Sequence, residues 1–191
     1  MEAFFVSTGL VALAEMGDKT QLLALLLAAR FRKPIPIVVG ILVATILNHA
    51  LAALLGQWLT GLVSPEMLRW ILAISFIAMA GWMLIPDKLD DETDSINRWQ
   101  KHGVFLATFI LFFIAEIGDK TQIATVALSA RFDSLFWVVM GTTVGMMIAN
   151  VPAVFIGDKM ANRLPISLIH KIAAAIFLVL GIVVIVQPYL S

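Results

Sequence analysis

Two copies of one acidic motif hold the residues of this sequence that are best suited to chemistry. The first copy is Glu15–Gln21 (EMGDKTQ), and the second is Glu116–Gln122 (EIGDKTQ). Hard divalent cations bind several oxygen ligands, and carboxylates supply the negative charge among them. The motifs therefore predict a divalent-cation site. Its candidate ligands are Glu15, Asp18, Gln21, Glu116, Asp119 and Gln122, with the hydroxyls of Thr20 and Thr121 as secondary candidates.

Each motif also contains a lysine, Lys19 or Lys120, four residues after its glutamate. On a helix this order favours an ion pair. One interpretation is that each lysine only neutralises a carboxylate. The other is that it tethers the carboxylates while the site is empty and releases them when a cation binds. Without a cation, four close carboxylates cannot all stay ionised, so some take up protons that an arriving cation would displace. Proton–cation exchange follows from this competition.

Three polar residues in the second and fifth apolar segments are further candidates: Asn48, His49 and Asn150. Asn48 could add an oxygen ligand. His49 could relay protons, or add a nitrogen ligand that would favour Mn²⁺ over Ca²⁺ or Mg²⁺. The alternative is an interhelical hydrogen bond, worth about 0.6 kcal/mol on average. His170 and Lys171, at the start of the last apolar segment, are expected to extend toward the membrane interface.

The elements that must position these groups are membrane spans. The chain of 191 residues is 61% hydrophobic and only 14% charged, which excludes an ordinary soluble domain. It has no cysteine and zero net charge, which excludes thiolate sites and gives no case for a nucleic-acid partner. Six apolar segments are long enough to cross a bilayer: Ala3–Ala29, Pro36–Leu59, Met67–Ile85, Val104–Ala130, Leu135–Gly157 and Ser167–Pro188.

The two halves of the chain align at an offset of 101 residues. Within residues 15–31, ten of the seventeen positions are identical to residues 116–132. Three spans per unit is an odd number, so the second unit must enter the membrane from the opposite side. We therefore predict an all-α integral membrane protein with six transmembrane helices in two inverted-topology three-helix repeats, residues 1–86 and 103–191, joined by a polar linker, residues 87–102. Such repeats are typical of secondary transporters.

The motifs fall near the middle of the first and fourth spans. A spacing of three residues places each Glu and Asp on one helical face. Gly17 and Gly118 weaken the helix between them, so local unwinding could expose carbonyl oxygens. The inverted repeat would then bring the two faces together. Charged side chains at that depth cost about 2.5–3.5 kcal/mol each on insertion scales, which argues for a function.

Loop charge predicts the orientation. One side has the basic residues Arg30, Arg32, Lys33, Lys88, Arg98, Lys101, Lys159, Arg163 and Lys171, whereas the other has Arg69 and Arg131. The first side should be cytoplasmic, which places both termini outside the cytoplasm. The acidic run in residues 87–94 is interpreted as a solvated linker, with a cation-concentrating mouth or a regulatory site as the alternative.

Paired Glu-x-Gly-Asp-Lys-Thr motifs on the first and fourth of six spans resemble a family of small cation exchangers. It includes Golgi calcium/manganese transporters and bacterial manganese exporters of the MneA type. The resemblance covers essentially the whole chain, and both motifs are intact at Glu15–Thr20 and Glu116–Thr121. It implies export of Mn²⁺, with Ca²⁺ as the second candidate, from the cytosol against protons, with the acidic residues as ligands. The compact chain without a long leader is similar to the bacterial members, so we expect a bacterial plasma-membrane protein.

Other functions stay open at this point. An exporter of a small cationic metabolite, such as an amino acid, could use the same acidic cluster with a larger cavity, and a passive cation channel needs no alternation. An enzyme is not expected, because the sequence has no His-Glu-x-x-His pair and no Gly-x-Ser-x-Gly elbow. No prosthetic group is expected. Partners should be the divalent ion, protons and the lipid bilayer, with the chain as a monomer or homodimer.

Overall fold

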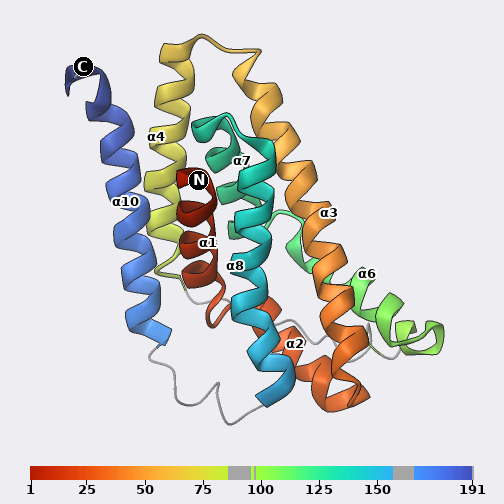
Figure 1. The fold of residues 1–191 in the computed structure, drawn as a ribbon. Helices are drawn as coiled ribbons and strands as arrows, with labels where there is room; N and C mark the ends of the chain where they lie inside the picture. Colours follow the sequence, from red (N-terminus) through yellow and green to blue (C-terminus); the bar gives the residue numbers. More distant parts are fainter. Residues whose placement is uncertain (86–95, 97, 157–165, 191) are drawn as a thin grey trace.

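All regular secondary structure is helical in the residues that the computed structural model of the protein describes, which are 1–85, 96, 98–156 and 166–190. The first half contains α1 (Glu2–Glu15), α2 (Lys19–Phe31), α3 (Pro34–Thr60) and α4 (Pro65–Trp82). The second half contains η1 (Gln100–His102), α6 (Val104–Glu116), α7 (Lys120–Phe132), α8 (Leu135–Ile156) and α10 (Ile166–Leu190). Figure 1 shows these helices as one bundle. The acidic run of residues 87–94 lies outside the described residues.

Within the described part of the chain, three helices are long and apolar enough to cross a membrane: Pro34–Thr60, Leu135–Phe155 and Ser167–Val186. The outer surface of the bundle is apolar. On α3, Ile35, Leu51 and Trp58 are 71%, 50% and 62% exposed, respectively. A set of polar residues lies inside instead, and both Glu15 and Glu116 are fully buried. Because an exposed apolar surface of this extent requires an apolar partner, the chain is a membrane protein with its outer face toward lipid.

Two helix breaks interrupt what the sequence predicts as continuous spans. The expected spans Ala3–Ala29 and Val104–Ala130 are each two helices, α1–α2 and α6–α7. Gly17 and Gly118 lie in the breaks with φ values of +84° and +75°. Glycine has no Cβ and adopts positive φ at little cost, so the unwinding expected at these glycines is present. Glu15 ends α1, and Asp18 is the extended N-cap of α2, so they do not share a helical face as expected.

Helix contacts recur at the offset of 101 residues. A Cβ atom on Gly40 of α3 would lie 2.8 Å from Thr108 Cβ of α6, and one on Gly141 of α8 would lie 2.9 Å from Ser7 Cβ of α1. The two contacts are equivalent in the repeat, because Gly141 lies 101 positions after Gly40 and Ser7 lies 101 positions before Thr108. Glycine at both positions lets the backbones approach closely. Consequently α1 packs on α8 as α6 packs on α3, so each half places its first helix against the long helix of the other half.

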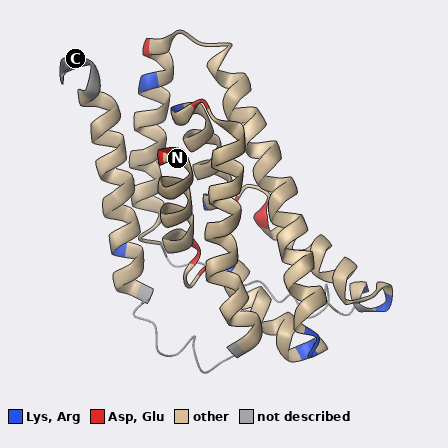
Figure 2. Cartoon of the chain, in the orientation of Figure 1, with Lys and Arg blue, Asp and Glu red and all other residues tan. Residues whose placement is uncertain are grey.

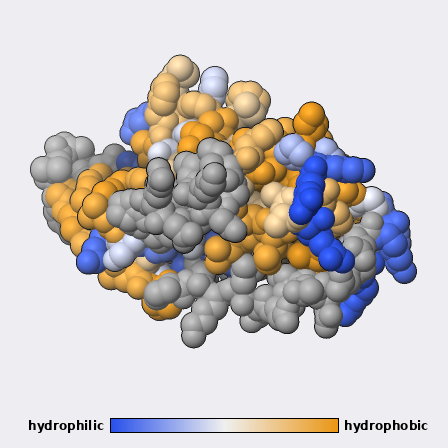
Figure 3. Space-filling model, turned by 90° about the horizontal axis from the view of Figure 1, so that it is seen from below, coloured by the Kyte–Doolittle hydropathy of each residue, from blue (hydrophilic) through white to orange (hydrophobic). Residues whose placement is uncertain are grey.

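Many of the basic residues gather at one end of the bundle, whereas the acidic residues of the two motifs lie in its middle. Figure 2 shows Lys and Arg gathered where α2 meets α3 and where η1 precedes α6, while acidic residues lie at the α1–α2 and α6–α7 breaks. Figure 3, seen from the lower end of Figure 1, shows hydrophilic residues beside hydrophobic ones on that end. The fold therefore buries the acidic groups of the two motifs inside an apolar bundle.

Candidate metal centre

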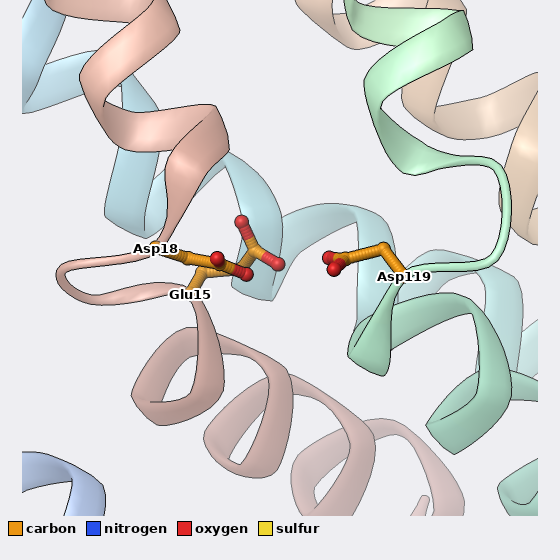
Figure 4. A group of neighbouring side chains, drawn as sticks. All are labelled: Glu15, Asp18 and Asp119. Carbon is orange, nitrogen blue, oxygen red and sulfur yellow. The ribbon is translucent and has the colours of Figure 1, made fainter. Parts of the chain in front are cut away.

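The two helix breaks bring three carboxylates together. Glu15 is the last residue of α1, whereas Asp18 and Asp119 are the N-caps of α2 and α7. One carboxylate oxygen from each lies within 4.8 Å of the others. Figure 4 shows Glu15 and Asp18 on one side and Asp119 opposite them, with the carboxylates pointing toward one another. Ligand atoms about 2.0–2.6 Å from one ion are separated by no more than about 5 Å, so this cluster has the dimensions of a cation site.

The carboxylates are almost completely removed from solvent. Glu15 and Asp18 are 0% exposed, and Asp119 is 3% exposed. Buried charge of one sign is costly unless an opposite charge compensates it. Lys19 supplies one such charge, since its Nζ lies 3.3 Å from Asp119 Oδ1. A divalent cation would supply the rest.

Lys19 differs from the expectation of pairing within its own motif. Because the chain unwinds between Glu15 and Lys19, the helical four-residue geometry does not exist, and Lys19 reaches across to Asp119 of the other motif. Lys19 is 28% exposed, whereas Lys120 is 1% exposed. The Lys120 Nζ donates to the carbonyl oxygen of Ile85 at 3.3 Å. The two lysines therefore occupy different environments.

The threonines of the motifs hold the glutamates. The Thr20 hydroxyl donates to Glu15 Oε2 at 2.5 Å. The Thr121 hydroxyl lies 3.1 Å from Glu116 Oε2 and 3.4 Å from Asp119 Oδ2. The other glutamate oxygens, Glu15 Oε1 and Glu116 Oε1, are buried and have no hydrogen-bond partner among the described residues. These two oxygens are acceptors that a cation or a proton could occupy.

The glutamines support the backbone at the breaks. Gln21 Oε1 accepts from the Gly17 N–H at 2.9 Å, and Gln122 Oε1 accepts from the Gly118 N–H at 2.7 Å. Gln21 Nε2 also donates to the carbonyl oxygen of Ala149 on α8 at 2.9 Å. Unwinding leaves backbone N–H groups without their helical hydrogen-bond partners, and inside a membrane protein such groups need another partner. The side-chain oxygens of Gln21 and Gln122 are these partners for Gly17 and Gly118. In this conformation the expected glutamine ligands serve as supports of the unwound segments.

The secondary candidates lie deep in the bundle. Asn48 Nδ2 donates to the carbonyl oxygen of Phe113 at 3.1 Å, and Asn150 Nδ2 to that of Met146 at 3.1 Å. The Oδ1 atoms of both asparagines are buried without a hydrogen-bond partner among the described residues. His49 is 0% exposed, and its Nε2 lies 3.9 Å from Glu116 Oε2. These contacts place His49 beside the second motif.

One contact was not anticipated from the sequence. His170 of α10 is 9% exposed, and its Nε2 lies 2.8 Å from the carbonyl oxygen of Met16 in the first break. It therefore packs inward rather than extending to the interface. The sequence carries no signal for this contact, because it depends on where α10 packs against the α1–α2 break.

A comparison with protein families matches most of the chain to one model. Residues 3–91 and 104–191 match the model described as divalent cation/proton antiporter GDT1. No solved structure matches the chain.

Curated relatives extend over nearly the whole chain. A protein of Vibrio cholerae serotype O1 named "Putative manganese exporter" is 55% identical over 183 residues, which is 95% of this chain and 90% of the relative. The protein of Synechocystis named "GDT1-like protein sll0615" is 28% identical over 202 residues, which is 96% of each chain. The protein of Arabidopsis thaliana named "GDT1-like protein 5" is 25% identical over 223 residues, covering 98% of this chain and 97% of the relative.

Proposed function

The chain belongs to the GDT1 family of divalent cation/proton antiporters, and from this premise we propose that it exports Mn²⁺ from the cytosol in exchange for protons. Ca²⁺ is the second candidate ion. The observation that carries the proposal is the convergence of Glu15, Asp18 and Asp119 on one buried point between two helix breaks. The name of the relative from Vibrio cholerae favours manganese. Carboxylate oxygens that all lie within 4.8 Å of one another suit one metal ion better than a bulky cationic metabolite.

Charge balance suggests how exchange works. With Glu15, Asp18, Asp119 and Lys19 all ionised, these four groups carry three negative charges and one positive charge, which leaves a net charge of minus two on this part of the centre. A divalent cation neutralises this charge. In the absence of the cation, protons on the carboxylates do the same, because like charges this close cannot all stay ionised. Cation and protons therefore compete for the same oxygens, and each displaces the other.

We infer that the architecture is two inverted three-helix repeats, residues 1–86 and 103–191, around a linker, residues 87–102. The long helices α3, α8 and α10 together with α4 would make four crossings, and the broken pairs α1–α2 and α6–α7 would make the other two. Support comes from the contacts that recur at 101 residues and from the two segments that match the family model. Movement of one repeat against the other would open the centre alternately to each side.

We place the protein in a bacterial plasma membrane with both termini outside the cytoplasm. Support comes from the basic residues at the end of the bundle where α2 meets α3, since basic residues favour the cytoplasmic side.

Transport into inside-out vesicles tests the function. Vesicles containing the protein should accumulate Mn²⁺ when their interior is acidic, and Ca²⁺, Mg²⁺ and Zn²⁺ added singly as competitors would rank the ions. Glu15→Gln should abolish uptake while the protein still folds, with Glu66→Gln as the matched control because Glu66 is 80% exposed. Mn²⁺ uptake that does not change with the pH difference across the membrane would indicate a passive channel. Normal Mn²⁺ uptake by the Glu15 variant would refute the assigned centre.

A further inference from the structure

His49 is a buried polar side chain whose polar atoms have no hydrogen-bond partner among the described residues. It lies on α3, is 0% exposed, and both its Nδ1 and Nε2 atoms lack such a partner. A buried polar group left unpaired costs about 1–3 kcal/mol, so each such group requires an explanation. A ligand that is bound during the transport cycle is one explanation.

The position of His49 relative to Glu116 suits a shared ion. The distance from His49 Nε2 to Glu116 Oε2 is 3.9 Å, which is beyond hydrogen-bond range. Two ligand atoms about 2.0–2.6 Å from one metal ion lie about 3–5 Å apart, because their angle at the ion ranges from 90° to 180°. The gap between the imidazole and the carboxylate therefore has the width that one ion would bridge.

Glu116 is also continuous with the three-carboxylate cluster. The Thr121 hydroxyl lies within 3.1 Å of Glu116 Oε2 and 3.4 Å of Asp119 Oδ2. Glu116 Oε1 is buried without a partner among the described residues, so it can accept a ligand bond. A cation next to His49 would therefore lie beside the carboxylates that the proposed function already uses.

The two halves of the chain differ at this position. The residue 101 positions after His49 is Asn150, and its Nδ2 bonds to its own helix through the carbonyl oxygen of Met146. The difference matters chemically because imidazole nitrogen suits transition-metal ions, whereas Ca²⁺ and Mg²⁺ prefer oxygen. Only the first half, through His49, would offer a nitrogen ligand at this position, and it would do so beside Glu116 of the second half.

We propose that His49 supplies a nitrogen ligand to the transported ion beside Glu116 and so favours divalent transition-metal ions, Mn²⁺ among them, over Ca²⁺ and Mg²⁺. The proposal rests on the proposed function, because it assumes that the acidic centre carries a divalent cation. In this role His49 is a specificity-determining residue.

The test combines a transport ratio with a spectroscopic signature. In vesicles supplied with MnCl₂ or CaCl₂, His49→Asn, which copies the residue of the second half, should lower the ratio of Mn²⁺ to Ca²⁺ uptake by about tenfold or more, a typical scale for altered metal coordination. His102→Asn is the matched control, because His102 is exposed and precedes α6. Pulsed EPR of Mn²⁺ bound to the unmodified protein should detect coupling to ¹⁴N, and the coupling should be absent from His49→Asn.

The outcomes separate this proposal from the function on which it rests. If the unmodified protein carries no Mn²⁺, both are wrong. If it carries Mn²⁺ and its EPR spectrum has no nitrogen coupling, His49 is not a ligand and only this proposal is overturned. An unchanged uptake ratio in a folded His49→Asn protein would overturn it as well. A nitrogen coupling that persists in the folded variant would assign the nitrogen ligand to another residue and would also overturn the proposal. His49→Gln is the second variant for these measurements if His49→Asn does not fold.

Discussion

Replacing Lys19 by glutamine should make the protein bind Mn²⁺ more tightly. The Lys19 ammonium lies 3.3 Å from Asp119 Oδ1, so it competes with the cation for the negative charge of this carboxylate. If the cation has to displace the ammonium, binding is weakened by the free energy of that ion pair. Glutamine keeps much of the side-chain length and removes the charge, so the competition ends. Release of the cation should become correspondingly slower.

The geometry of the pair gives the size of the effect. At 3.3 Å and an effective dielectric constant of about 20, two unit charges attract by about 5 kcal/mol. Desolvation and side-chain ordering offset most of this attraction, and Lys19 is 28% exposed while Asp119 is 3% exposed. A net value of about 1–2 kcal/mol, between those of exposed and buried pairs, corresponds to an affinity about 5–30-fold higher.

Calorimetric titration of MnCl₂ into purified protein measures this affinity directly. Lys33→Gln is the matched control, because Lys33 is exposed at the far end of α2 and should leave the affinity unchanged. Lys19→Arg keeps the charge and should restore most of the competition. An affinity that is unchanged or lower in Lys19→Gln would refute the reasoning, since Lys19 would then stay in place when the cation binds.

Three further predictions concern pH and the two kinds of glycine. Mn²⁺ binding should weaken as pH falls, because protons then occupy the carboxylate oxygens that the cation needs. The same calorimetric titration should detect proton release when Mn²⁺ binds. Binding that is independent of pH would show that the metal ion and the protons occupy different sites. Gly118→Ala should destabilise the protein by about 1–2 kcal/mol, since its φ of +75° is unfavourable for any residue with a Cβ. Thermal unfolding measures this loss of stability, and Gly9→Ala is the control because a Cβ on Gly9 in α1 would meet nothing within 4 Å. Equal melting temperatures of the two variants would contradict the prediction. Gly141→Ala should cost about 1–3 kcal/mol, because its Cβ would lie 2.5 Å from the carbonyl oxygen of Phe4, whereas Gly81→Ala on α4 meets nothing. A Gly141 variant as stable as the Gly81 variant would show that α1 and α8 separate easily.

The sequence predicts the features that depend on local pattern. Apolar length marks α3, α8 and α10, and all three are long apolar helices. Glycine between two acidic residues predicts weakened helix, and Gly17 and Gly118 lie at breaks with positive φ. Family membership follows from the motifs, because their residue types and order are specific, and the comparison confirms it.

The sequence does not predict the features that depend on how the breaks face each other. Four-residue spacing suggests that Glu15 pairs with Lys19. The break between α1 and α2 removes this helical geometry, and the Lys19 ammonium pairs with Asp119 instead. Gln21 has the chemistry of a ligand, yet its oxygen accepts from the Gly17 N–H that the unwinding exposes. In both cases a local break changes which partner is within reach. Spacing rules for a continuous helix therefore fail at the residues that matter most here.

The two motifs are almost identical in sequence, but their aspartates make different bonds. Asp18 Oδ1 accepts from the Lys19 N–H at 2.6 Å and so caps α2, whereas the side chain of Asp119 does not cap α7 and pairs with Lys19 Nζ. A carboxylate at a helix N-terminus is stabilised by the helix dipole, so capping is a stable alternative to ion pairing or metal binding. An aspartate can therefore leave the cation or the lysine without becoming an unpaired buried charge. Each aspartate therefore has a second partner besides the cation: Asp18 has the N-terminus of α2, and Asp119 has the ammonium group of Lys19.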